Sequence, residues 1–291
     1  MDLDDFYNRA FSRNRGLINE EEQQKLKNTR VAIPGMGGMG GTHAATLART
    51  GIGHYTVADF DEFDVHNINR QYGAMASTVG KPKASVMAEK VKDINPGADV
   101  RVFDVAIGAD NVDAFLEDVD VVIDALDVFA MDARRLIYRR SKELGIPVLF
   151  TAPIGFSAAM FLFSPDGMDC DTFFGFTDEM SNNELVLYFL AGIGGVGPHL
   201  KYMDVTKIDP TTGGAPSVGM ACNIGAGMVA TEVVNWVLKR RTVKAIPWFM
   251  QFDPYARYYK NHYRWLGARN PIQRLRMKVL RKMVPALSEQ G

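Results

Sequence analysis

Residues 31 to 41 read V-A-I-P-G-M-G-G-M-G-G, an apolar run that ends in a glycine-rich loop. The spacing of Gly35, Gly37 and Gly40 fits the Gly-x-Gly-x-x-Gly pattern, which predicts a strand, a tight turn and a helix in a nucleotide-binding fold. Glycine lets the backbone approach a phosphate or a sugar, and the helix that follows offers free N–H groups. The loop suits NAD and ATP equally, so other residues must decide the chemistry.

The chain around this loop alternates between strand and helix patterns. Strands over 30–33 and 55–58 flank a helix over 42–50, which makes a βαβ unit. Alternation of this kind implies an α/β fold with a Rossmann-like parallel sheet and helices on both faces. The further expected helices are 83–94, 111–116 and 133–144, and the further expected strands are 99–103, 120–125 and 147–151.

Beyond Thr151 the alternation fades. Residues 158–163 predict a strand of an antiparallel extension, and 219–238 predict a long helix of small residues suited to close packing. The last segment mixes aromatic and basic residues, and 271–284 predict a basic amphipathic helix whose apolar stripe consists of Ile272, Leu275, Val279, Leu280 and Met283.

Composition predicts a soluble, cytoplasmic protein. Hydrophobic residues make up 47% of the chain and charged residues 23%, and no apolar stretch has the length of a membrane span. The first residues are acidic, unlike a secretory signal. Two cysteines, Cys170 and Cys222, are too few for a four-cysteine zinc site, so we expect no structural zinc.

Charge is distributed unevenly although the formal net charge is only −1. From Lys239 to Lys282 there are 13 basic residues and one acid, against 20 basic and 33 acidic residues elsewhere. This basic tail, 239–284, suits an anionic partner such as RNA or a membrane surface, and it equally suits docking on the acidic body of the same protein.

The residues after the second strand indicate whether the protein catalyses nucleotidyl transfer or hydride transfer. Asp59 lies about twenty residues beyond the loop, where a carboxylate can accept hydrogen bonds from ribose hydroxyls, and Asp61 follows it. The stretch 64–71, D-V-H-N-I-N-R-Q, contains Asn67 and Arg70, and Lys83 follows shortly afterwards. Hydride transfer needs no such cations, whereas nucleotidyl transfer needs them to neutralise a leaving pyrophosphate.

Asp127 completes this set. It follows the buried strand 120–125, and a carboxylate at that position suits Mg²⁺ held between phosphates. Taken singly, Arg70 is better explained as a surface ion pair and Lys83 as the first residue of a helix after Pro82. In combination they favour ATP over NAD.

The ordered set G-x-G-G-x-G, D-F-D, N-x-N-R-Q, G-x-P-K, I-N-P and D-A-x-D resembles the ThiF/MoeB/HesA superfamily, which includes the ubiquitin-activating enzymes. The resemblance covers residues 5–165 and returns in 214–238. It implies a homodimer that uses ATP and Mg²⁺ to adenylate a carboxylate, often the C-terminal glycine of a small carrier protein. It further implies roles for the following residues: Gly35, Gly37, Gly38 and Gly40 line the nucleotide, Asp59 and Asp61 lie at the ribose, Asn67, Arg70 and Lys83 bind phosphates, Asp127 holds the metal, and Arg9 of the Y-N-R triplet acts on the neighbouring subunit's triphosphate.

On this resemblance we expect three parts. Residues 1–29 form an N-terminal arm, 30–250 an ATP-binding adenylation domain and 251–291 a basic C-terminal extension. The central domain divides into a nucleotide-binding half, 30–155, and a substrate and dimer half, 156–250.

The chain also departs from the family pattern. The zinc-binding cysteine pairs of many members are missing, because Phe173 follows Cys170 where a second ligand would stand. The segment 208–216, I-D-P-T-T-G-G-A-P, contains no cysteine that could accept an acyl group. Cys222 falls in an apolar helix and Cys170 in an acidic loop, so neither is expected to be a strong nucleophile. The sequence therefore predicts adenylation without an enzyme thioester.

Three alternatives remain open at this stage. The first is a tRNA-modifying dehydratase similar to the enzymes that cyclise threonylcarbamoyladenosine, which would suit the absent zinc and the basic tail. The second is a non-catalytic nucleotide-binding subunit of an activating complex. The third, an NAD oxidoreductase, leaves Arg70, Lys83 and Asp127 unexplained.

Overall fold

The computed structural model describes residues 2–194, 197–204, 207 and 216–283. One eight-stranded sheet runs through the described chain in the order β3-β2-β1-β4-β5-β6-β7-β8. The first five strands in this order are parallel, and β6, β7 and β8 continue the sheet as antiparallel strands. The predicted fold class, a Rossmann-like parallel sheet with an antiparallel extension, is confirmed. The strands are β1 (Arg30–Pro34), β2 (His54–Ala58), β3 (Asp99–Phe103), β4 (Val121–Asp124), β5 (Val148–Ile154), β6 (Ser157–Phe163), β7 (Trp248–Asp253) and β8 (Tyr258–Tyr263).

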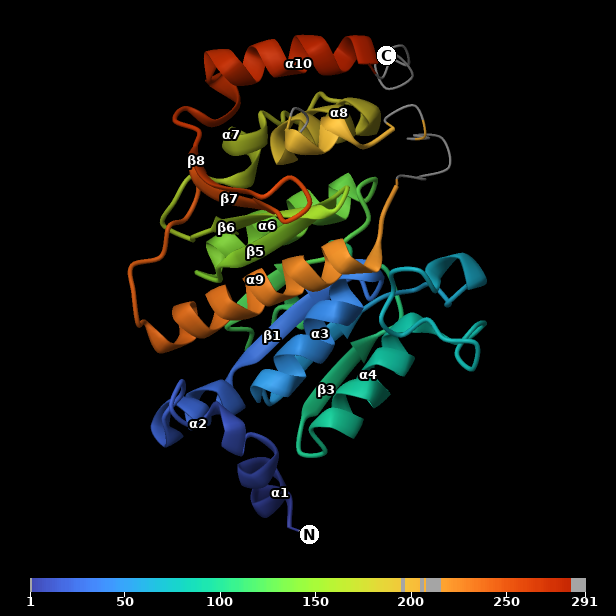
Figure 1. The fold of residues 1–291 in the computed structure, drawn as a ribbon, viewed down its shortest axis with the longest axis vertical. Coiled ribbons are helices and arrows are strands. Elements are labelled where there is room, and N and C mark those ends of the chain that lie inside the picture. The colour runs from blue at the N-terminus through green and yellow to red at the C-terminus, as the bar shows by residue number, and fades with distance from the viewer. Residues whose placement is uncertain (1, 195–196, 205–206, 208–215, 284–291) are drawn as a thin grey trace.

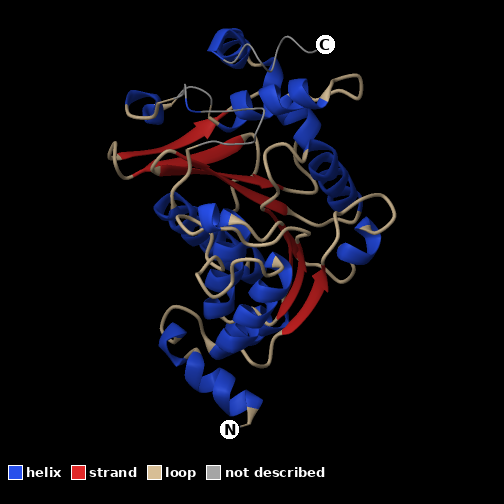
Figure 2. Ribbon diagram, turned by 90° about the vertical axis from the view of Figure 1, so that its right-hand side faces the viewer, coloured by secondary structure: helices blue, strands red, loops and turns tan. Residues whose placement is uncertain are grey.

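Helices cover both faces of this twisted sheet, as expected for parallel strands that are apolar on both sides (Figures 1 and 2). One face packs against α2 (Glu20–Asn28), α3 (Gly38–Thr50), α4 (Lys83–Ile94) and α9 (Gly219–Leu238). The other packs against α5 (Val112–Phe115), α6 (Met131–Glu143), α7 (Cys170–Phe174), α8 (Asn182–Ile193) and α10 (Pro271–Met283).

Helix α9 links the two halves of the sheet. It packs on α3, β5 and β6, and its small residues allow this close approach: a Cβ at Gly225 would lie 2.7 Å from Met39 Cε. By length and composition α9 is apolar enough to cross a membrane, so the expectation that no apolar stretch has the length of a membrane span is wrong for 219–238. Its packing makes it a core helix of this domain.

The N-terminal arm consists of α1 (Leu3–Ala10) and α2, and it is anchored at the far end of α3. Tyr7 donates a hydrogen bond from its hydroxyl to the Gly51 carbonyl oxygen at 2.6 Å, and Gln23 donates to the Tyr7 hydroxyl. Gly51 closes the C-terminus of α3, so the arm lies at the end of that helix opposite to the glycine loop.

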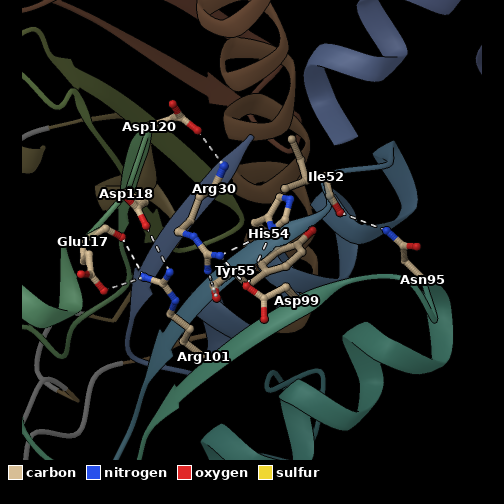
Figure 3. Close-up of polar contacts among 10 residues, drawn as sticks. All are labelled: Arg30, Ile52, His54, Tyr55, Asn95, Asp99, Arg101, Glu117, Asp118 and Asp120. Atoms are coloured by element: carbon tan, nitrogen blue, oxygen red, sulfur yellow. Dashed lines mark hydrogen bonds and ion pairs between the residues drawn. The ribbon is translucent and has the colours of Figure 1, made fainter. Parts of the chain in front are cut away.

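At the amino end of the strands, Arg30 ties several elements together (Figure 3). Its guanidinium donates to the Tyr55 carbonyl oxygen at 3.0 Å and pairs with the Asp99 carboxylate, while its backbone N–H donates to Asp120 at 2.8 Å. The hydrogen bond from Arg30 holds the pKa of Asp99 below its ordinary value. Ligands of parallel sheets bind at the opposite, carboxyl edge, so these charges serve stability.

The C-terminal segment differs from the expected helical extension in one respect. Before α10 it forms a β-hairpin, β7 and β8, which is built into the main sheet. The expected domain boundary at residue 250 therefore falls inside β7. One face of this hairpin packs in the core through Phe249, and the other leaves Tyr259 and Tyr263 largely exposed. The high density of cations obscures this period-two pattern in the sequence.

Candidate nucleotide-binding site

Two of the loop glycines are required by the turn itself. Gly35 has a φ of +91°, and a Cβ there would lie 2.3 Å from the Ala125 carbonyl oxygen. A Cβ at Gly40 would lie 1.8 Å from the carbonyl oxygen of Gly35. Both contacts are with backbone, which cannot move aside. The turn therefore brings the end of β1 against the segment that follows β4.

The other two glycines face a more open space. A Cβ at Gly37 would meet no atom closer than Gln71 Nε2 at 3.6 Å, and one at Gly38 would lie 3.2 Å from Cys222 Sγ. Gly37 is the N-cap of α3, and no side chain caps this helix. The N–H groups of its first turn are thus available to a phosphate, which the dipole of the helix also attracts.

Gln71 is a residue of this site that sequence reasoning missed. Its side chain is 8% exposed and approaches Gly37, and its Oε1 is buried without a hydrogen-bond partner among the described residues. A buried polar atom without a partner beside an uncapped helix end fits a bound hydroxyl or amine donor. The signal was present in the sequence as the last residue of N-x-N-R-Q.

Asp59, Asp61 and Lys83 form a linked group beside the loop. The Asp59 carboxylate accepts hydrogen bonds from the Met36 N–H at 2.6 Å and the Asp61 N–H at 2.9 Å. The Lys83 ammonium is 2.9 Å from the Asp61 carboxylate, and the Lys83 side chain is 9% exposed. Asp59 therefore holds the backbone of the loop at Met36, and Asp61 positions the Lys83 ammonium.

The protonation of Asp59 reflects this position. Burial raises the pKa of its carboxyl above the ordinary value, and the two N–H donors and Lys83 oppose this rise. The Met36 and Asp61 N–H groups and the Lys83 ammonium stabilise the carboxylate form of Asp59 against the effect of burial. A carboxylate beside the loop can accept a hydrogen bond from a ribose hydroxyl.

Arg70 and Asn67 come from the short helix η2 (Val65–Asn67) and the turn after it. The Arg70 guanidinium donates to the His66 carbonyl oxygen and to Asn69 Oδ1, both at 3.0 Å, and its stem lies beside Gly38. Asn67 is buried, and its Oδ1 accepts from the Asp64 N–H at 3.0 Å. Arg70 is thus a cation at the loop, whereas the observed contact of Asn67 caps η2.

Asp127 lies on the exposed turn after β4. Its carboxylate accepts a hydrogen bond from the Phe129 N–H at 2.9 Å. No group of three or more metal-ligating side chains occurs among the described residues. One carboxylate is still a suitable protein ligand for Mg²⁺, which usually completes its shell with water and substrate phosphates. Asp127 fits that role because the Gly35 contact brings its turn to the loop.

Arg134 of α6 fixes this turn, and the sequence analysis did not identify it. Its side chain is 1% exposed, and Nε donates to the Asp124 carboxylate at 2.7 Å. The other guanidinium nitrogens donate to the carbonyl oxygens of Leu126, at 2.8 Å, and Asp127, at 3.2 Å. The Tyr138 hydroxyl donates to the same Asp124 carboxylate at 2.9 Å. A buried ion pair therefore holds the backbone that carries Asp127.

Arg9 is not brought to the site within one chain. It lies on α1, is exposed, and its guanidinium is 3.7 Å from the Asp5 carboxylate. The 13-residue helix α3, about 20 Å long, separates the anchor of the arm at Gly51 from the glycine loop. Any action of Arg9 on a nucleotide therefore requires a second chain.

Both cysteines are buried. Burial raises the pKa of the Cys170 thiol well above its ordinary value, and burial also raises that of Cys222. Cys222 adjoins Gly38, and Cys170 begins α7 within the aromatic core that includes Phe173. Neither is an accessible thiolate. The segment 208–216 has no cysteine in its sequence, and most of it lies outside the described residues.

With this geometry established, the class of protein follows from comparison with known sequences. Residues 11–266 match the ThiF family, and the chain belongs to that family. The resemblance drawn from the ordered motifs is therefore confirmed.

Individual relatives give a more detailed view. The tRNA threonylcarbamoyladenosine dehydratase of Bacillus subtilis (strain 168) is 41% identical over 118 residues, which are 40% of this chain and 46% of the relative. The dehydratase of Escherichia coli (strain K12) is 37% identical over 154 residues, 53% of this chain and 57% of the relative. The sulfur carrier protein ThiS adenylyltransferase of Bacillus subtilis is 30% identical over 155 residues, 53% of this chain and 46% of the relative. The chain thus spans about half the length of these relatives.

Solved structures extend the similarity in fold. The E. coli dehydratase TcdA has a TM-score of 0.60 at 23% identity, covering 82% of this chain and 98% of that one. E. coli MccB with ATP has a TM-score of 0.61 at 19% identity, covering 86% of this chain and 67% of that one. These structures match a larger share of this chain than the curated sequence relatives do.

The two kinds of loop glycine predict different responses to alanine. Gly40→Ala should lower the free energy of unfolding by about 1–3 kcal/mol, since its Cβ meets fixed backbone, even though alanine favours helix by about 1 kcal/mol. Gly37→Ala, the matched control, should change the free energy of unfolding by less than about 0.5 kcal/mol. Urea denaturation measures both, and equal stability of the two variants would contradict the described turn.

The buried pair predicts non-additive substitutions. Arg134→Met alone leaves Asp124 buried without its cation and should cost about 3–5 kcal/mol of unfolding free energy. Adding Asp124→Leu should recover most of that loss, because replacing both charges removes the uncompensated carboxylate. A double-mutant cycle in urea gives the coupling energy. Losses that simply add would show that Arg134 does not pair with Asp124.

Proposed function

We propose that this protein is an ATP- and Mg²⁺-dependent adenylyltransferase that activates a substrate carboxylate as an acyl-adenylate and releases pyrophosphate. One observation carries the proposal: the uncapped end of α3, Arg70, the Asp61–Lys83 pair and Asp127 meet at the carboxyl edge of the same parallel sheet. The ThiF family membership supports it, as do the relatives named adenylyltransferases.

The residues have separable roles in this reaction. The first turn of α3 and Arg70 would bind the phosphates, Asp59 would accept from the ribose, and Lys83 would stabilise charge near the α-phosphate. Asp127 would hold Mg²⁺, which supplies further neutralisation of the triphosphate when bound. A carboxylate oxygen of the substrate attacks the α-phosphorus, the bond to the bridging oxygen breaks, and pyrophosphate leaves. The protein contributes orientation and charge rather than proton transfer.

The acyl-adenylate is proposed to react without forming a thioester on this chain. Burial of Cys170 and Cys222, with raised pKa values for both thiols, supports this view. Substrates that fit are the C-terminus of a small carrier protein or peptide, or a small carboxylic acid. The relatives named sulfur carrier and SAMP-activating enzymes support the first of these.

A second candidate is dehydration of threonylcarbamoyladenosine in tRNA, which also begins with activation of a carboxylate. The observation that favours it is the identity of 41% and 37% to two dehydratases of that name, each over about half of their length. A non-catalytic role in an activating complex is less well supported, because the chain retains Arg70, Lys83 and Asp127 together.

We also propose a homodimer formed through α9 and the β7–β8 hairpin. The sheet face that α9 covers at β5 and β6 continues onto the hairpin, where Tyr259 and Tyr263 are 61% and 54% exposed. The ring of Tyr263 contacts that of Trp248 at a tilt of 45°, with ring centroids 4.6 Å apart. The adjoining surface of α9 presents Met220 (55% exposed) and Gly227, whose missing side chain leaves open space. A second copy is the occupant that would bring Arg9 to the site.

Pyrophosphate exchange tests the proposed reaction. With ATP, Mg²⁺ and either a small carrier protein ending in glycine or total tRNA, the protein should incorporate labelled pyrophosphate into ATP. Arg70→Ala should slow exchange by about 30- to 1,000-fold, equivalent to about 2–4 kcal/mol of transition-state stabilisation. Lys92→Ala, an exposed cation on α4, is the control. Full exchange by the Arg70 variant would remove Arg70 from the site, and exchange that requires tRNA would favour the second candidate.

Light scattering tests the dimer. The unmodified protein should have twice the chain mass of 32.3 kDa, and Tyr259→Asp with Tyr263→Asp should give the chain mass itself. Leu17→Asp, on an exposed apolar residue of the arm, should leave the dimer intact. Mixed Arg9→Ala and Arg70→Ala chains should regain part of the exchange activity, because one site in a mixed dimer is complete. A monomeric unmodified protein would contradict this arrangement.

A further inference from the structure

The end of the molecule opposite to the N-terminal arm is formed by α10, which crosses the long axis of the molecule (Figure 1). The chain reaches it from β8 through Trp265 and Leu266 and the short helix η5 (Gly267–Arg269). The proposed chemistry at the glycine loop uses none of these residues.

Only part of the apolar stripe of α10 faces the protein. Gln273 (4% exposed) and Leu280 (8% exposed) lie on its buried side, Met277 is partly buried in the core, and the helix packs against α8. Ile272 and Leu275, expected on the same stripe as Leu280, are instead 65% and 63% exposed. The apolar residues of α10 cover more of the helix surface than its contact with the protein does, so Ile272 and Leu275 remain exposed to solvent.

The turn before the helix adds two more exposed apolar side chains. Trp265 is 52% and Leu266 48% exposed. Leu266 has a φ of +63°, in the left-handed region that a leucine rarely adopts. The next residue, Gly267, packs closely against α7: a Cβ there would lie 2.5 Å from the Thr172 carbonyl oxygen. A strained backbone that presents large apolar side chains to solvent indicates a functional surface.

The charge of this end is of one sign. From Pro254 to Val284 the chain has nine basic residues and no acid, whereas residues 1–253 have 24 basic and 33 acidic residues, a net charge of −9. Within the described chain, no carboxylate forms an ion pair with any of these cations: Arg257, Lys260, Arg264, Arg269, Arg274, Arg276 and Lys278.

Arg264 is buried without a carboxylate partner among the described residues, and its guanidinium lies over the rings of Phe173 and Phe249, 4.5 and 4.9 Å from their centroids. Its side chain is 5% exposed, it donates to the Gly192 carbonyl oxygen at 2.7 Å, and its Nη1 has no described partner. Burial, together with the nearby charge of Arg276, lowers the pKa of its guanidinium to about 9. The basic end is therefore not neutralised by docking on the acidic body.

We propose that this end of the protein binds the surface of an anionic phospholipid bilayer. Trp265, Leu266, Ile272 and Leu275 would enter the headgroup region, and Arg269, Arg274 and Lys278 would contact lipid phosphates. Cations alone would fit nucleic acid, but the exposed isoleucine and leucines contribute nothing to phosphate contacts. The segment 254–284 contains no acid, and its cations lie beside exposed apolar side chains on a helix across the end of the molecule, a combination that suits an anionic membrane surface.

The acidic body supports this orientation. A net charge of −9 on residues 1–253 is repelled by an anionic bilayer, so only the basic end approaches it. The attraction amounts to about 1 kcal/mol for each Lys or Arg near the surface and decreases with salt. Apolar insertion adds a contribution that salt does not screen.

Vesicle sedimentation of the full-length protein tests the proposal. Vesicles of phosphatidylcholine with phosphatidylglycerol should bind the protein, and vesicles of phosphatidylcholine alone should bind it weakly or not at all. Arg274→Glu with Lys278→Glu should weaken binding by about thirtyfold or more, the equivalent of two cations. Arg13→Glu with Lys92→Glu, which makes the same charge change on the body, should bind as the unmodified protein does.

The apolar contribution has its own variants and readout. Ile272→Ser with Leu275→Ser should weaken binding at low and high salt, whereas Leu17→Ser should have no effect. Brominated lipids should quench the Trp265 fluorescence, and Trp265→Phe should remove that quenching while Trp236 and Trp248 remain. Thermal unfolding of each variant confirms that it is folded. Equal binding to neutral and anionic vesicles, unchanged binding by both tip variants, or retention of RNA but not of vesicles would overturn the proposal.

Discussion

The contact between Gly35 and the Ala125 carbonyl oxygen is the constraint on which the arrangement of the site depends. A Cβ at Gly35 would lie 2.3 Å from that oxygen, so only glycine allows the turn after β1 to touch the segment after β4. β1 and β4 are neighbouring parallel strands, and their carboxyl ends meet at one edge. The contact places the glycine loop beside the turn that carries Asp127. The loop is also held by Asp59, whose carboxylate accepts a hydrogen bond from the Met36 N–H.

A site of this kind needs its flexible parts to be held, and buried charge does that on both sides of the loop. Arg134 and Asp124 fix the backbone of Leu126 and Asp127 from within the core, and Asp61 holds the ammonium group of Lys83. Lys83 is thus preorganised by a carboxylate, and Arg70 is held by the His66 carbonyl oxygen and Asn69 Oδ1. Such preorganisation is what a reaction that depends on charge neutralisation requires, because no reorganisation energy is then spent during the step.

Much of the fold could be predicted from the sequence, because strands, helices and glycine turns leave local patterns. The βαβ unit, the helix after the loop and the buried strand ending in Asp124 were all legible in this way. The β7–β8 hairpin was not, because aromatic and basic residues obscure its alternation. The residue pattern named Asp61, Lys83 and Asp127, but the pairing of Asp61 with Lys83 and the hold of Arg134 on the Asp127 turn are decided by three-dimensional packing. The position of Arg9 depends on a second chain, and a basic amphipathic pattern does not say which part of α10 meets the core.

The central claim is that the loop at residues 35–41 serves a nucleoside triphosphate rather than a dinucleotide. Isothermal titration calorimetry of the unmodified protein with ATP and Mg²⁺, and separately with NAD, tests this most directly. Saturable binding of ATP, weakened when Mg²⁺ is withheld, with no heat from NAD, is the result that the arrangement of Arg70, Lys83 and Asp127 predicts. Tight binding of NAD together with no binding of ATP would contradict it.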